Sequence, residues 1–141
     1  MKKIALSGLF VAAFFIVGAQ VPANPSNNAS TAKDFVKPPG IGDVKNTTTL
    51  IVDDLISKLS LPIGKRQSLT GAVNGFLTTK KDIAGLAETN PTDYTSKFGG
   101  MQKTLFGKLK TIMGATAFTK FLGMKPSGAT VAGNPLSHLF F

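Results

Sequence analysis

Between residues 46 and 125 the apolar positions recur every three or four residues, which is the period of α-helices that bury one face. The first helix is expected to start at Asn46 or at one of the three threonines that follow, any of which can act as its N-cap. Pro62 is expected to end it, because proline cannot continue a helix. Its buried stripe consists of Ile51, Leu55 and Leu59.

A second helix is predicted over about residues 65–88, and a third begins at Asn90-Pro91-Thr92-Asp93. That tetrapeptide combines a capping side chain, a proline at the first helical position and an acid in the first turn, all of which favour a helix start. The glycine pair Gly99-Gly100 predicts a kink or break within the third helix. The apolar seam of this helix consists of Tyr94, Phe98, Met101, Leu105, Leu109 and Ile112.

A short, phenylalanine-rich helix is expected after Gly114, and it should end at Gly123, shortly before Pro126. Alternating apolar and polar residues, the pattern of a strand, are weak throughout the chain. The sequence therefore predicts an all-α fold, either a small helical bundle or an extended helical hairpin of about four helices. This helical domain spans residues 46–125.

The amino-terminal region differs from the helical domain. Two lysines followed by the uncharged stretch 4–17 have the layout of a secretory signal, so residues 1–19 are predicted to be a signal peptide. An uncleaved membrane anchor is the alternative, although the stretch is short for a bilayer span. Residues 20–45 contain four prolines among small polar residues, which predicts a disordered linker. The expected location is periplasmic or extracellular, in a bacterial envelope.

Residues 126–141 are predicted to form a flexible tail that finishes in the apolar segment 136–141. Two interpretations of that segment are open. It folds back over an exposed end of the bundle, because exposed apolar patches are unfavourable, or it is an address that a partner's pocket binds.

The amino-acid composition excludes several kinds of catalytic and metal site. The net charge is +9, from sixteen basic and seven acidic side chains, and cysteine is absent. Without cysteine there is no disulfide, thiolate zinc site or thiol nucleophile. The single histidine, His138, lies in the predicted tail, where it is poorly placed to activate a nucleophile. We therefore expect no catalytic residue, no metal site and no cofactor, and we expect that the protein is not an enzyme.

The third helix carries a candidate binding face in which two lysines border an apolar seam. Acidic or unfolded polypeptide is the expected partner, and snorkelling of the same lysines at an anionic membrane surface is an alternative. A bundle helix with solvated lysines is the simplest interpretation. Nucleic acid is not expected, because the aromatic residues do not lie among the lysines. The five residues of this face are Phe98, Met101, Leu105, Lys97 and Lys108.

The second helix carries a candidate association face at Gly71 and Gly75, which lie one turn apart and opposite the apolar seam. Each glycine lowers helix stability by about 0.5 to 1 kcal/mol relative to alanine. Their spacing allows close approach of another backbone, so a homodimer or another partner is the functional interpretation. A marginally stable helix under relaxed selection is the alternative.

Two helix-leading segments, 63–67 and 113–117, are similar to the Leu-Thr-x-x-Gln motif of the Spy/CpxP-like periplasmic proteins. In that motif Thr at the N-cap and Gln at the third helical position form a capping box. Here Gly64 and Gly114 stand in place of Thr, Gln67 retains the glutamine and Ala117 replaces it. The resemblance covers about residues 59–125. It implies a small, non-enzymatic helical envelope protein, often dimeric, that binds unfolded chains or senses envelope stress.

From these observations together we expect a non-catalytic exported helical binding protein of the cell envelope, chaperone-like or stress-sensor-like. A carrier of lipid or another amphiphile, or a membrane-surface-associated protein, is the alternative.

Overall fold

The computed structural model describes residues 35–141, so the predicted signal peptide and residues 20–34 of the predicted linker lie outside the described residues. Contacts divide the chain into Met1–Val36 and Lys37–Phe141, and the fold below is that of the second unit. The described residues form six α-helices and no β-strand, which confirms the all-α prediction. None of the described helices is both long and apolar enough to span a membrane.

Helix α2, Val44–Lys58, starts slightly earlier than predicted because Asp43 is its N-cap. The Asp43 carboxylate accepts a hydrogen bond from the Asn46 amide at 2.7 Å, which satisfies one of the free donors of the first turn. The helix ends before Pro62, at Lys58, and Ser60 follows with a φ of 52°.

The predicted second helix is divided into two. A 3-10 turn, Ile63–Lys65 (η2), leads into α3, Arg66–Ile83, and after two turn residues the short α4 follows at Leu86–Thr89. The interruption falls at Ala84 and Gly85. Glycine has a low helix propensity, and Gly85 is exposed, so its site gains little from packing.

Helix α5, Pro91–Met113, begins as predicted: the Asn90 side chain accepts a hydrogen bond from the Asp93 amide at 3.2 Å. It runs unbroken through Gly99-Gly100, so the expected break is absent. Buried residues before and after the pair anchor both halves to the core. Helix α6, Ala115–Leu122, follows Gly114, whose φ of 92° and ψ of 161° are accessible only to glycine.

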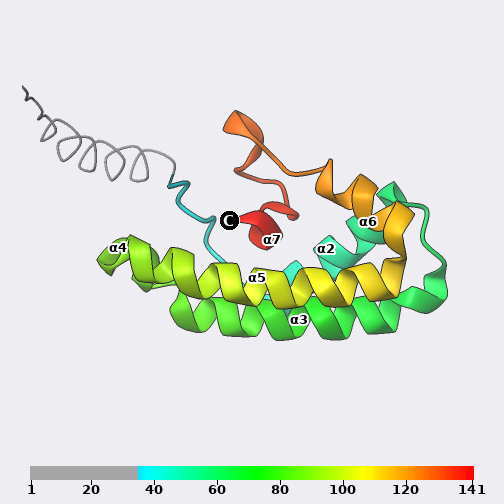
Figure 1. Cartoon of the computed structure of the whole chain (residues 1–141), viewed down its shortest axis with the longest axis horizontal. Coiled ribbons are helices and arrows are strands. Elements are labelled where there is room, and N and C mark those ends of the chain that lie inside the picture. The colour runs from blue at the N-terminus through cyan, green and yellow to red at the C-terminus, as the bar shows by residue number, and fades with distance from the viewer. Residues whose placement is uncertain (1–34) are drawn as a thin grey trace, which may run out of the picture. The chain divides into compact units, whose positions relative to one another are not determined.

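Helices α3 and α5 run side by side in opposite directions (Figure 1), with α2 packed against α3 and α6 folded back on α5. Their inward faces form the core. Leucine and valine dominate its α3 side, and aromatic rings from α5 and α6 extend it. The fully buried aliphatic side chains of α2, α3 and α5 are Ile51, Val52, Leu55, Leu69, Val73, Leu77 and Leu109.

The segment after α6 is folded, which corrects the prediction of a flexible tail over residues 126–141. It contains a 3-10 turn, Gly128–Thr130 (η3), and a final short helix, α7, Ser137–Phe140. Leu136, Leu139 and Phe140 are at most 8% exposed. Of the two interpretations of the apolar segment, folding back onto the bundle is the one the structure shows.

Candidate functional site

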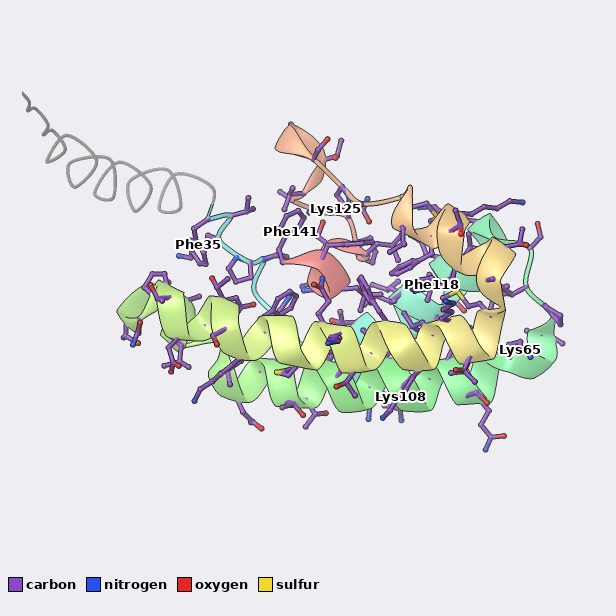
Figure 2. All side chains as sticks on the ribbon, viewed as in Figure 1. Phe35, Lys65, Lys108, Phe118, Lys125 and Phe141 are labelled. Atoms are coloured by element: carbon purple, nitrogen blue, oxygen red, sulfur yellow. The ribbon has the colours of Figure 1, made fainter. Side chains whose placement is uncertain are left out.

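A groove open to solvent runs between α3 and α5. It consists of two adjoining hollows of about 590 and 220 Å³ that share Gly71, Ala72, Thr104 and Lys108. In Figure 2 Lys108 lies along the α3–α5 pair, away from the cluster around Phe118 and Phe141. The apolar side chains that line the groove are Ala72, Phe76, Met101, Leu105 and Ile112.

Glycine backbone forms part of the groove's wall. Gly71 and Gly75 come from α3 and Gly107 from α5. A methyl group built on any of the three would meet no atom within 4 Å. The packing of the folded chain therefore does not require glycine at these positions, and each lowers helix stability relative to alanine. What these glycines provide is room beside the backbone for an incoming group.

The groove's threonines present methyl groups rather than free hydroxyls. Thr79 Oγ1 donates to the Gly75 carbonyl at 3.1 Å, Thr104 Oγ1 to Gly100 at 3.2 Å and Thr111 Oγ1 to Gly107 at 3.1 Å. Each bond runs back one turn along the threonine's own helix, which occupies the hydroxyl proton. The groove surface is therefore more apolar than its composition suggests.

Charge is sparse and positive along the groove. The sequence has no charged residue from 67 to 79, which covers most of the α3 wall. Lys108 lines both hollows, and among the described residues no ion pair involves it. On the same face of α5 Lys97 lies 3.6 Å from Asp93, with its side chain half exposed. The groove thus offers an uncompensated ammonium beside an apolar surface.

The structure brings the two predicted faces together in part. Gly71 and Gly75 share the groove with Met101 and Lys108, although sequence reasoning treated them as separate surfaces. Met101 is half-buried and Lys108 exposed, so both are accessible from solvent. Lys97 is exposed too, but the groove lining does not include it.

Two members of the candidate binding face belong to the core. Phe98 is 7% exposed; its ring stacks on Tyr94, with centroids 5.7 Å apart, and meets Phe76 edge-on at 5.8 Å. Leu105 is 2% exposed and contributes only to the floor of the groove. The five residues therefore do not form one exposed surface, because the apolar seam of α5 is used for packing against α3.

The sequence did not predict the buried polar cluster around Lys80. Lys80 is 1% exposed, and its Nζ donates to the carbonyl oxygens of His138, at 2.8 Å, and Phe141. The same atom lies 5.1 Å from the centroid of the Phe98 ring. Burial lowers the pKa of Lys80 to about 7. The available signal was its position: Lys80 follows Val73, Phe76 and Leu77 at helical spacing on the buried face of α3.

This cluster is closed to substrates. A desolvated lysine with a lowered pKa is the type of residue that attacks carbonyl groups. Lys80, however, is buried and is not part of the groove lining. Its Nζ is already hydrogen-bonded to two backbone oxygens. Within residues 35–141 no three His, Asp or Glu side chains are grouped as metal ligands would be. Of the groove and the Lys80 cluster, only the groove is open to a ligand from solvent.

In comparisons with known proteins, no family model, no curated protein and no solved structure matches this chain. The similarity to the Leu-Thr-x-x-Gln motif stays a prediction from the sequence.

Proposed function

We propose that this protein is a non-catalytic helical binding protein of the cell envelope that holds polypeptide in the α3–α5 groove. The proposal rests on the groove, which is mostly apolar, is walled in part by glycine backbone and has an unpaired lysine, Lys108, at its edge. Two antiparallel helices with an open seam offer a third helix a place to pack. Glycines at the seam let that helix approach closely.

The expected ligand is an apolar stretch of unfolded or partly helical polypeptide that carries acidic residues. Its apolar side chains would cover Met101 and Ile112, which are half-buried in the groove lining, and a carboxylate would pair with Lys108. Removal of the predicted signal peptide takes away Lys2 and Lys3 and leaves fourteen basic and seven acidic side chains, and this net positive charge also favours encounter with acidic partners. Export and a chaperone-like or stress-sensing role belong to the same proposal, and the sequence of residues 1–19 supports the export.

Filling the groove tests the proposal without disturbing the core. Gly71→Leu and Gly75→Leu place side chains into open space and raise helix propensity, so both variants are expected to fold. They should lose the ability to delay aggregation of an acidic protein kept unfolded by reduction of its disulfides. Gly99→Leu is the matched control, because Gly99 is exposed on α5, has open space at its Cβ and does not line the groove.

Retention of full activity in both groove variants would reject the groove as the binding site. An equal loss in Gly99→Leu would show instead that any added apolar side chain interferes.

A lipid or amphiphile carrier is the second candidate, and the apolar lining beside Lys108 favours it. An acyl chain would occupy the methyl-rich channel while an anionic headgroup pairs with the ammonium. Native mass spectrometry of the purified protein distinguishes the two candidates, because a carrier should retain acyl chains, whereas a polypeptide-binding protein should carry peptide or nothing.

Self-association through Gly71 and Gly75 remains a prediction. Sedimentation of the protein at several concentrations tests it, and a dimer that also forms in Gly75→Leu would reject these glycines as the interface.

A further inference from the structure

Residues 127–141, here called the strap, are held onto the bundle by two side-chain donors from different helices. Lys80 of α3 donates to the carbonyls of His138 and Phe141, and Gln102 Nε2 of α5 donates to Leu139 at 2.8 Å. A helix as short as α7 cannot satisfy its own last carbonyls. The polar attachment of the strap therefore depends on these two donors.

Beneath those donors the strap covers an aromatic surface. The Phe140 ring stacks on Phe121 of α6, with centroids 5.0 Å apart, and meets Phe106 of α5 edge-on at 5.7 Å. Leu136 and Leu139 are buried beside it. Detaching the strap would expose apolar surface both on the strap and on the bundle.

His138 is placed where a positive charge is unfavourable. Its Nδ1 atom is buried and has no hydrogen-bond partner among the described residues. Burial, and secondarily the charge of Lys80, lower the pKa of His138 to about 4. A released strap would return the imidazole to water, where its ordinary pKa is 6.5.

Most of α5, the whole of α6 and the strap itself offer no carboxylate side chain to a protonated His138. The charged groups that the structure places against α7 are Lys80 from α3, which donates to the terminal carboxyl oxygen of Phe141, and Lys125 from the segment after α6, whose Nζ lies 5.1 Å from the Phe141 ring centroid. Residues 94–141 include no aspartate or glutamate.

We propose that the strap is an acid-released cover: protonation of His138 beside the Lys80 ammonium detaches α7 and uncovers Phe106 and Phe121. Acid favours release because the His138 imidazole binds a proton more tightly in the released state than in the docked state. Release is therefore promoted as the pH falls from 6.5 towards 4. The device is independent of the α3–α5 groove and adds a second, conditional apolar surface to the protein.

Hydrogen exchange of the full chain, analysed by mass spectrometry at pH 6.5 and pH 4 and corrected for intrinsic rates, tests the proposal. Protection of the strap should fall by up to about 100-fold, which is the limit set by the two pKa values of His138. Protection of α3 should stay unchanged. In His138→Gln the strap should keep the same protection at both pH values.

Three results would overturn the proposal: an equal loss of strap protection in His138→Gln, a simultaneous loss in α3 that signals global unfolding, or no loss at all. A measurement on the unsubstituted chain guards against a variant that fails to fold. His138 is the only histidine, so its imidazole protons give one unambiguous NMR titration. A midpoint between 4 and 6.5 that coincides with the loss of strap protection supports the cover. A midpoint near 6.5, or a midpoint near 4 with the strap still protected, rejects it.

Discussion

Replacing the buried lysine, Lys80→Met, should remove a pH dependence of folding that the structure requires. Burial lowers the pKa of Lys80 from 10.5 to about 7, so between these values the unfolded chain binds a proton that the folded chain lacks. The free energy of unfolding therefore rises with pH across this window. Below pH 7 both states are protonated, and this contribution to stability is lost.

The magnitude follows from the size of the pKa difference. At about 1.4 kcal/mol per pH unit, the full window corresponds to roughly 4 to 5 kcal/mol. Two carbonyl acceptors and the face of the Phe98 ring favour the charged form and offset part of this. Between pH 7.5 and 9.5 we expect the unsubstituted protein to gain about 2 kcal/mol, and Lys80→Met to gain less than about 0.5 kcal/mol.

Urea unfolding followed by circular dichroism at 222 nm, at three pH values from 7.5 to 9.5, measures this difference. The range stops below pH 10 because burial raises the pKa of Tyr94 from 10.0 to about 12. Above pH 10 the unfolded chain therefore loses a proton that the folded chain keeps, and the free energy of unfolding falls with pH. Lys81→Met is the matched control: Lys81 is the next residue on α3 but is exposed and reaches only the Gly42 carbonyl, at 3.3 Å. It should keep the slope of the unsubstituted protein. A Lys80→Met variant with that same slope would show that Lys80 is not the source of the pH dependence.

Three further predictions concern stability and use thermal or urea unfolding. Phe140→Ala should lower the free energy of unfolding by about 3 kcal/mol, because it removes a ring packed between Phe106 and Phe121; a loss below 1 kcal/mol would mean that the strap is not docked in solution. Asn90→Ala should cost about 1 kcal/mol through loss of the α5 cap, and no change would indicate that another group replaces it. Gly71→Ala and Gly75→Ala should each stabilise the monomer by about 0.5 to 1 kcal/mol, since the added methyl meets open space; destabilisation would point to a contact that the monomer does not show.

Local signals in the sequence were sufficient for most of the helical architecture. The start of α5 depends on Asn90, Pro91 and Asp93, which act within one turn, and it was predicted to the residue. The start of α2 was misplaced because Asp43 is a strong cap that precedes the apolar stripe. Gly99 and Gly100 were expected to interrupt α5, but tertiary packing on both sides of the pair overrides their low propensity.

The candidate site was harder to predict, because it depends on which helices become neighbours. An apolar seam is visible in the sequence, but whether Phe98 and Leu105 face a partner or the core is decided by the pairing of α3 with α5. The same pairing joins Gly71 to Lys108 across the groove. Lys80 shows the limit most clearly, since its carbonyl acceptors lie 58 and 61 residues away in the chain.

Methyl NMR of the protein labelled with ¹³C at methionine shows whether polypeptide binds in the α3–α5 groove. Met101 lines the α3–α5 groove, whereas Met124 lies beyond α6 and outside the groove lining. On addition of an unfolded acidic polypeptide, we expect the Met101 methyl signal to shift and the Met124 signal to stay unchanged. Binding that leaves Met101 unaffected, or that shifts Met124 instead, would contradict a binding site in the groove.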